Sequence, residues 1–387
     1  MKLLRYSIKN SFARKLTSLL TVLGVGLVVF VFCAVLMLSN GLEQVLVDTG
    51  EADNVVVIRQ SATTEVVSIL WRQMADVVKA DPSIAVDESG APLFAGELVV
   101  LINKPRKSDG GAANLTVRGV DEASLKVRPH VKLAAGRWWR EGTSEIVAGV
   151  KLAENFEGCQ LGDQIKFGAR EWTIVGLMEA DGSGFESEIW GDVDQLMAAF
   201  ERPVYSSFVF RLKDPTTFEA TEKRLEGDRR LTVDVIPEIE YYRRQSQSFT
   251  TFIGILGTVI SIVFSLGAIV GAMITMYAAV ANRTREIGTL RALGFGRVSI
   301  LGAFLTESLL IAFAGGLIGI ACANILSLRE VQTTNFDTFA EIAFSFRMSL
   351  GIAGKALVFA LVMGIVGGFL PAVRASRFRI INALRAR

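Results

Sequence analysis

The chain has 387 residues, of which 51% are hydrophobic and 21% charged, and its 41 basic residues nearly balance its 39 acidic ones. This apolar content excludes a disordered or low-complexity chain. A single histidine, His130, excludes a histidine-rich metal site and argues against a Ser-His catalytic triad. Cys33 and Cys322 lie in apolar stretches and Cys159 in a polar one, so we expect a buried free thiol at Cys159 and no disulfide framework.

The N-terminal segment combines a basic leader with an uncharged stretch. Residues 1–15 carry basic side chains and no acidic ones, and Leu4, Ile8 and Phe12 share one helical face. We predict a cytoplasmic interfacial helix over 1–15, with a disordered basic leader as the alternative. Residues 16–38 are uncharged and long enough for a first transmembrane helix, TM1. No small-residue cleavage site ends this stretch, which favours a retained anchor over a signal peptide.

The long polar segment 39–248 is predicted to be a mixed α/β domain. Runs of β-branched residues predict strands, and apolar residues at helical spacing predict helices. Strands at both ends with an insertion between them indicate two subdomains. The polar, glycine-rich segment 104–111 is expected to be a mobile hairpin tip. Strands are predicted at 54–59, 97–102, 114–119, 144–149, 164–167, 171–178, 204–212 and 231–236, and helices at 65–80 and 216–226.

This domain also holds an acidic cluster and a tryptophan pair. The acidic spacing matches no calcium loop and has no nearby histidine, so we interpret it as a solvated face or a helix N-terminal charge bias. The alternative is a cation site or acid-base pair. Trp138-Trp139 is interpreted as packing under a turn, with a contact patch for an apolar ligand as the alternative. The acidic residues are Glu186, Glu188, Asp192 and Asp194.

Three further apolar stretches predict three more transmembrane helices. The uncharged stretch from Gln245 to Asn282 is longer than a bilayer requires, so part of it is expected to continue outside as a stalk. The predicted segments are TM2 with its stalk extension at 249–281, TM3 at 298–322, an extracytoplasmic loop at 323–348, TM4 at 349–373 and a cytoplasmic tail at 374–387.

Charge is distributed unevenly along the chain. Basic residues collect in 1–15, 282–297 and 374–387, whereas 39–248 carries an acidic excess. Because positive loops remain in the cytoplasm, we expect these three basic segments and both termini inside. Segment 39–248 is then expected to be extracytoplasmic.

Residues 282–297 predict more than a topological anchor. Ile287, Leu290 and Leu293 recur at i, i+3 and i+6, and Gly294-Phe295-Gly296 interrupts the helix. We expect a short amphipathic helix under the membrane, able to transmit force between the membrane and a cytoplasmic partner. A basic loop that only anchors topology is the alternative.

The apolar stretches contain one internal acid and three glycine pairs. Glu307 is a candidate proton relay by its position, but a single acid without a partner favours a structural hydrogen bond near the inner interface. Lys355 is expected to snorkel outward. Glycines four residues apart allow close helix packing. The pairs are Gly267 with Gly271, Gly315 with Gly319, and Gly364 with Gly368.

Four motifs carry a family resemblance: RKLTSLLTVLGVGLVVF, RTREIGTLRALGF, FLTESLLIAFAGGLIG and GGFLPAVRASRFRIINALR. With these motifs the chain resembles the MacB/FtsX/LolC-type permeases of ABC transporters, the type VII or mechanotransmission class. Segment 137–178 is also similar to the core of the MacB-type periplasmic domain. Ile380, in the last motif, stands where the family commonly has a proline.

The resemblance implies partners and a location. A dimer, most simply of two copies of this chain, would bind cytoplasmic ABC ATPase subunits, which would hold ATP and Mg while this chain binds no cofactor. A periplasmic adaptor and membrane lipids are further implied partners, nucleic acid is not, and the location is the bacterial cytoplasmic (inner) membrane. The implied ATPase-coupling residues are Arg283, Arg285, Glu286, Ile287, Leu290, Arg291, Leu293 and Phe295.

The sequence favours a non-catalytic permease subunit. The nearest match to a P-loop, Ser349–Ala356, lacks the first glycine and the final Ser/Thr, so ATPase activity is expected in a partner chain. We predict that ATP hydrolysis moves the extracytoplasmic domains for export or extraction of a substrate. The alternative is an FtsX-like signal transmitter that activates an extracytoplasmic partner such as a cell-wall hydrolase. A membrane-bound enzyme has the least support, because no nucleophile–base or metal set is visible.

Overall fold

The computed structural model describes residues 15–328, 330–335 and 337–378. These residues divide into a helical unit and an α/β unit. The helical unit comprises the chain up to Asn40 together with Phe252–Arg329 and Ser345–Arg387, and the α/β unit comprises Gly41–Thr251 and Glu330–Phe344. The predicted interfacial helix at 1–15, except for its last residue, and the Ile380 motif position lie outside the described residues.

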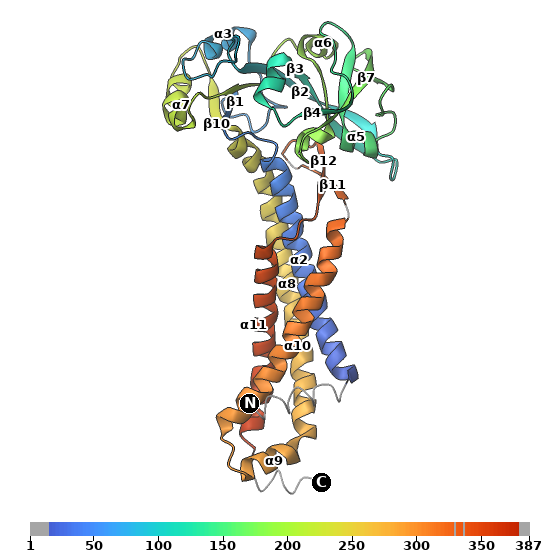
Figure 1. Cartoon of the computed structure of the whole chain (residues 1–387), viewed down its shortest axis with the longest axis vertical. Coiled ribbons are helices and arrows are strands. Elements are labelled where there is room, and N and C mark those ends of the chain that lie inside the picture. Colours follow the sequence, from blue (N-terminus) through green and yellow to red (C-terminus); the bar gives the residue numbers. More distant parts are fainter. Residues whose placement is uncertain (1–14, 329, 336, 379–387) are drawn as a thin grey trace. The chain divides into compact units, whose positions relative to one another are not determined.

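Four long helices dominate the helical unit (Figure 1). Each is long and apolar enough to cross a membrane. Helix α9 is a short additional helix between α8 and α10. The bounds are α2 Lys15–Val47, α8 Glu238–Asn282, α9 Thr284–Ala292, α10 Arg297–Ile325 and α11 Leu350–Ser376.

Two apolar clusters hold the helical unit together. In the first, residues of α2 such as Val29 and Cys33 pack against Ala356 and Ala360 of α11. In the second, Val280 of α8 and Ile287 of α9 pack with residues of α10 and α11. Helix α9 is therefore part of the packed helical unit.

A ten-stranded sheet forms the centre of the α/β unit, in the order β10-β1-β9-β2-β3-β8-β5-β7-β4, with β6 paired to β7. One apolar core lies at the β1/β9/β10 end and another at the β3/β5/β7/β8 end. Strand β2 contributes residues to both cores, so a single sheet joins them. The strands are β1 Asn54–Arg59, β2 Phe94–Pro105, β3 Ala112–Val120, β4 Lys132–Gly136, β5 Glu145–Gly149, β6 Gln164–Phe167, β7 Arg170–Glu179, β8 Glu188–Asp192, β9 Ser207–Arg211 and β10 Val233–Pro237.

Short helices cover this sheet and connect its strands. Asp192 caps the N-terminus of α6, and its side chain accepts hydrogen bonds from the backbone N–H groups of Asp194 and Gln195. The helices are α3 Arg72–Lys79, α4 Glu122–Val127, α5 Val150–Asn155, α6 Val193–Ala199 and α7 Phe218–Glu226.

The segment predicted as a loop at 323–348 contains two strands, β11 (Glu330–Thr334) and β12 (Glu341–Ser345). They pair with each other, and residues 330–344 belong to the α/β unit. Glu341 forms an ion pair with Arg106 at 2.7 Å, and Phe344 is fully buried. These contacts explain why the segment is ordered against the sheet domain.

The predicted helix at 65–80 begins only at Arg72. The prediction was wrong over 65–71 because tertiary bonds hold this segment in another conformation. The Glu65 side chain joins a buried ion cluster, Leu70 forms a β-bridge with Tyr205, and the Ser68 hydroxyl accepts the N–H of Arg59. Apolar spacing alone did not reveal these partners.

Candidate functional site

Helix α9 is the first candidate site, because it holds most of the predicted coupling residues. It runs from Thr284 to Ala292, with Leu293 as its C-cap, and the following Gly294 adopts a left-handed φ of +95°. The N–H of Phe295 bonds to the Leu290 carbonyl and closes the last turn. The glycine break that the sequence predicts is therefore a tight C-terminal cap.

The predicted coupling residues divide into an exposed and a packed group. Leu293 is 72% exposed and Phe295 39%, whereas Ile287 is only 2% exposed and packs in the helical core. Residues at i, i+3 and i+6 point in successively different directions around a helix. Leu293 also lies after the last residue of α9. Ile287, Leu290 and Leu293 therefore do not form one exposed stripe. The exposed group is Arg285, Glu286, Leu293 and Phe295; Arg283, Ile287, Leu290 and Arg291 are buried or half-buried.

Glu307 has the structural bond that the sequence predicts, and its partner is Arg283. Arg283 Nη1 lies 2.8 Å from Glu307 Oε2, and the two side chains are 15% and 6% exposed. Arg283 therefore points into the helical unit, which differs from its expected role as an ATPase contact.

Two of the three glycine pairs lie at tight helix crossings. A Cβ on Gly319 would lie 2.5 Å from the backbone oxygen of Gly26, and one on Gly364 would lie 2.5 Å from the Ala312 Cβ. Gly315 and Gly368 are equally crowded. Gly267 and Gly271 of α8 instead face open space, so only this pair is available to a second chain or to lipid.

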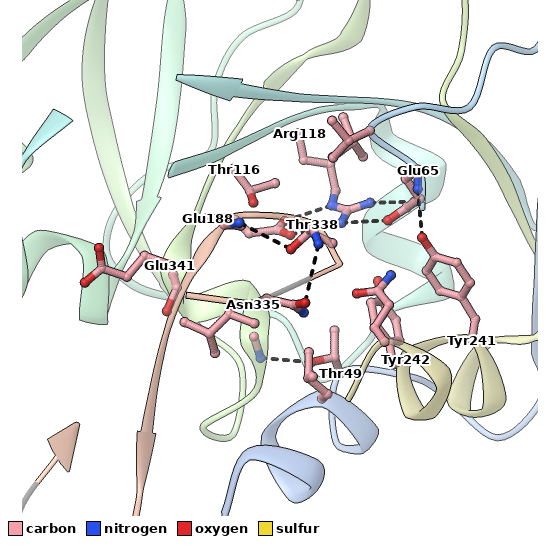
Figure 2. Close-up of a pocket in the computed structure, with 18 residues that line it drawn as sticks. Thr49, Glu65, Thr116, Arg118, Glu188, Tyr241, Tyr242, Asn335, Thr338 and Glu341 are labelled. Carbon is pink, nitrogen blue, oxygen red and sulfur yellow. Dashed lines mark hydrogen bonds and ion pairs between the residues drawn. The ribbon is translucent and has the colours of Figure 1, made fainter. Parts of the chain in front are cut away.

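The second candidate site is a buried ion cluster in the α/β unit. Arg118 of β3 contacts three carboxylates. It lies 3.0 Å from Glu65 and 2.8 Å from Glu188 (Figure 2), and 2.8 Å from Glu97. Arg128 contacts Glu97 and lies 3.0 Å from Glu238. The cluster consists of Glu65, Glu97, Arg118, Arg128, Glu188 and Glu238, all at most 12% exposed in their side chains.

Sheet register explains how the cluster forms. Arg118 lies opposite Val99 of β2, which is two residues after Glu97 and on the same face of that strand. Thr116 lies opposite Glu188 of β8. Adjacent strands therefore bring the charges within reach of one another. Glu238 enters from the first turn of α8, which anchors that helix in the cluster.

Burial and neighbouring charge act in opposite directions on these groups. Burial raises the pKa of Glu97, but the guanidinium groups of Arg128 and Arg118 outweigh it and hold that pKa below its ordinary value. Burial would lower the pKa of Arg118, but Glu188 and Glu65 raise it well above the ordinary value. Both groups therefore remain charged in the folded domain.

A cavity of about 50 Å³ lies beside the cluster (Figure 2). Its lining includes Tyr242 of α8 and Asn335 between β11 and β12, whose hydroxyl and Nδ2 atoms have no hydrogen-bond partner in the described residues. The cavity can hold one or two water molecules. It is far smaller than the roughly 300–1,000 Å³ of a drug-sized ligand site, so its geometry indicates a structural role.

The four acidic residues between 186 and 194 lie in two different environments. Glu186 and Glu188 are buried and paired with Lys151 and Arg118, so the prediction of a solvated face was wrong for them. Asp192 caps α6, and Asp194 lies in its first turn, as a helix N-terminal charge bias predicts. Among the described residues, no group of three or more His, Cys, Asp or Glu is arranged to hold a metal ion.

Sequence reasoning missed the buried ion cluster. A signal existed, since Glu97 and Arg118 are single charges inside otherwise apolar strands, FAGELVV and NLTVRGV. Lone charges in such strands indicate a buried pair. Their partners could not be chosen from local pattern, because Glu65 and Glu238 are distant along the chain.

Trp138 and Trp139 meet edge to face, with ring centroids 5.6 Å apart, and both are half-buried. Cys159 is fully buried, as predicted, and burial raises the pKa of its thiol to about 11. The thiol is therefore protonated and unreactive near neutral pH.

Two family models match the chain. The MacB-like periplasmic core domain matches residues 18–228, and the FtsX-like permease C-terminal domain matches residues 251–380. The chain is 26% identical over 98% of its length to the macrolide export ATP-binding/permease protein MacB of Neisseria gonorrhoeae, and 28% identical over 98% to that of Neisseria meningitidis serogroup B. It spans 60% of the length of each of these relatives.

Solved structures resemble part of the chain. The extracellular domain of the transporter YknZ from Gram-positive bacteria matches 47% of this chain and 99% of its own, with 14% identity and a TM-score of 0.36. The periplasmic region of MacB from Actinobacillus actinomycetemcomitans matches 48% of this chain and 89% of its own, with 12% identity and a TM-score of 0.35. On the two family models, which follow one another along the sequence and between them extend from residue 18 to residue 380, the chain belongs to the MacB/FtsX-type permeases.

Proposed function

We propose that the chain is the permease subunit of an ABC transporter and couples ATP hydrolysis by a separate ATPase subunit to movement of its extracytoplasmic domain. The chain itself would be non-catalytic, and ATP and Mg would bind the partner. The MacB relatives are named ATP-binding/permease proteins, and this chain matches 60% of their length. Family membership supports the permease assignment.

The continuity of α8 is the observation that carries this proposal. The helix runs without interruption for 45 residues from Glu238 to Asn282. Its first turn is fixed in the α/β unit, because Glu238 contacts Arg128 and the Tyr241 hydroxyl accepts the N–H of Glu65. Its last turn leads directly into α9. A continuous helix that begins in the α/β unit and ends beside α9 offers a route along the chain by which a displacement of α9 can reach that unit.

The exposed end of α9 supplies a docking surface for the ATPase. Leu293, Phe295 and Val298 are exposed apolar side chains, and Arg285 and Glu286 are exposed charges on the same segment. A compact apolar centre with charged neighbours is typical of protein–protein contacts. We propose that these residues contact the ATPase on the cytoplasmic side of a bacterial inner membrane.

A second permease chain fits an open face of α8. Gly267 and Gly271 face open space and lie among exposed apolar side chains, including Val263, Val270 and Ile274. Small residues at this spacing allow another helix to approach closely, and lipid would cover the rest. We propose a homodimer at this face, with export or extraction as the activity and a periplasmic adaptor as a further partner.

ATP hydrolysis in lipid nanodiscs tests the proposal. The ATPase is the one that co-purifies with the chain. Its turnover is measured in three conditions: without the chain, with the wild-type chain, and with the Leu293→Asp variant. Leu293 is preferable to Ile287, because a charge at the buried Ile287 would also disrupt the helical core. Leu161→Asp, which changes an exposed leucine of the α/β unit, is the matched control.

We expect the wild-type chain and the Leu161 variant to bind the ATPase and change its turnover, and the Leu293 variant to bind at least about tenfold more weakly, as loss of a central interface residue does. If no ATPase co-purifies or responds, α9 is a topological anchor and the permease proposal fails.

A further inference from the structure

The ion pair between Arg283 and Glu307 lies where a buried charge is costly. Glu307 is 5% exposed in the interior of α10, eleven residues into a 29-residue apolar helix. Arg283 reaches it from the junction between α8 and α9 at 2.8 Å. An apolar pair would fill the same space without desolvating two charges, so the geometry calls for a reason beyond packing.

Two further contacts fix α9 to the same helical unit. Ile287 packs with Ile300 and Phe304 of α10 and with Ala372 and Ala375 of α11. In the last turn, Arg291 Nη1 donates a hydrogen bond of 2.8 Å to the carbonyl of Ser376 at the C-terminal end of α11. A positive charge at that position also complements the helix dipole.

These contacts divide α9 into two functional faces. One face, formed by Arg283, Ile287 and Arg291, is held by α10 and α11, and the other, with Arg285 and Glu286, is exposed. The backbone leaves α8 at Asn282 and reaches Arg283 one residue later. The ion pair thus joins α9 directly to α10, in addition to the chain connection between α9 and α8.

We propose that Arg283 and Glu307 are positioning residues that fix the first turn of α9 to α10 and so transmit the ATPase-driven displacement into the transmembrane helices. The inference rests on the proposed function and assigns these two residues to transmission, and the exposed residues of α9 to binding. Because the bond is directional, the pair holds α9 at one angle, which an apolar contact would leave less defined.

The test separates binding from transmission in nanodiscs. The co-purifying ATPase is titrated against wild type, Arg283→Gln, Glu307→Gln, the neutral double variant Arg283→Gln/Glu307→Gln and the reversed double variant Arg283→Glu/Glu307→Arg. Two quantities are measured: the concentration of ATPase at half-maximal response, and the maximal change in turnover. Glu286→Gln is the matched control, since it removes an exposed charge from the same turn of α9.

We expect both single variants and the neutral double variant to lose the maximal response about tenfold, a typical size for a coupling between sites, with the half-maximal concentration unchanged. The neutral double variant keeps the proposal testable if a single variant does not fold, because it removes both charges of this ion pair together. The reversed variant is expected to recover at least half of the response. Glu286→Gln is expected to change the half-maximal concentration alone.

A neutral double variant with the same maximal response as wild type would overturn the assignment of Arg283 and Glu307 to transmission. The two side chains would then serve only to neutralise each other's buried charge. The assignment would also be overturned if these variants raised the half-maximal ATPase concentration as much as they lowered the maximal response. Failure of wild type to bind or stimulate any ATPase would instead refute the proposed function, and the two failures are distinguishable.

Discussion

Phe185 shows how the α/β unit tolerates two buried arginines next to each other. Its ring centroid lies 5.3 Å from the Arg118 guanidinium carbon and 4.9 Å from that of Arg128. The negative face of an aromatic ring attracts cations, and four carboxylates complete the surroundings. The cluster is thus paired throughout, and removing one member leaves the others uncompensated.

We therefore predict that Arg118→Met destabilises the α/β unit by about 3–5 kcal/mol, because three buried carboxylates lose a partner. All five tryptophans lie in this unit, so intrinsic fluorescence during urea unfolding of the full chain reports on it alone. Arg72→Met is the control, since the Arg72–Asp194 pair is more than half exposed and worth about 0–1 kcal/mol. Equal midpoints for the two variants would contradict the prediction.

A pH dependence follows from Glu97. Its pKa is lowered in the folded domain, so its stabilisation is complete above the unfolded value of about 4.3 and is lost as the pH falls below it. Asp121 acts in the opposite direction, because burial raises its pKa. We predict that the difference in urea midpoint between wild type and Glu97→Gln is constant from about pH 7 to 5 and narrows below about pH 4.3. A difference that stays constant down to about pH 3 would exclude this role.

At the scale of elements, strands were predictable where local pattern and tertiary environment agree. The β-branched run of β1 and the turn-bounded β6 coincide with their predicted ranges. Strand β8 was missed because EIWGD reads as polar, although all five residues are buried through ion pairing and capping. Strand β4 was missed because KLAAG carries little β signal. In both cases, partners distant in sequence decide the conformation.

In the candidate sites too, features that depend on local sequence were predictable, and features that depend on tertiary packing were not. The sequence predicted α9, its glycine break and a structural bond for Glu307, since spacing and charge are local properties. It did not predict which side of α9 is buried, because that depends on α10 and α11. Nor could it show which glycine pairs lie at helix crossings. Gly315 and Gly267 each begin a pair with the same four-residue spacing, but Gly315 is crowded by another helix and Gly267 faces open space.

The crossing of α2 and α10 gives a prediction at this scale. In Gly319→Ala, the new Cβ would meet the Gly26 oxygen at 2.5 Å and the Val29 Cβ at 2.8 Å, so the helices must separate. We expect a loss of about 1–3 kcal/mol, as overpacking costs, and a lower thermal midpoint in detergent. Gly302→Ala on the same helix has open space around its Cβ and should leave the midpoint unchanged or slightly higher. A Gly319 variant as stable as the Gly302 variant would contradict this packing.

The whole molecule combines a polar sheet domain and an apolar helical unit that share two helices. Helices α2 and α8 both run along the chain from one unit into the other. At 1.5 Å per residue, α8 alone is about 68 Å long. This exceeds a hydrocarbon core of about 30 Å, so one helix can both span a membrane and extend beyond it.

Charge asymmetry predicts which unit faces which compartment. The segment around α9 is basic and the α/β unit acidic, so the positive-inside rule predicts that they face opposite sides of a membrane. We predict that, in intact cells, a membrane-impermeant thiol reagent labels Leu161→Cys, which is 47% exposed in the α/β unit, and does not label Leu293→Cys, which is 72% exposed beside α9.

Leu293→Cys should become labelled once the membrane is permeabilised, which serves as its positive control. The experiment uses a Cys322→Ser background, because Cys322 is exposed whereas Cys33 and Cys159 are buried. The rule rests on the cost of moving basic loops across the membrane, so the outcome tests the charge argument directly. Labelling of both positions in intact cells would place α9 outside, where a cytoplasmic ATPase could not reach it, and the proposed coupling would fail with the topology.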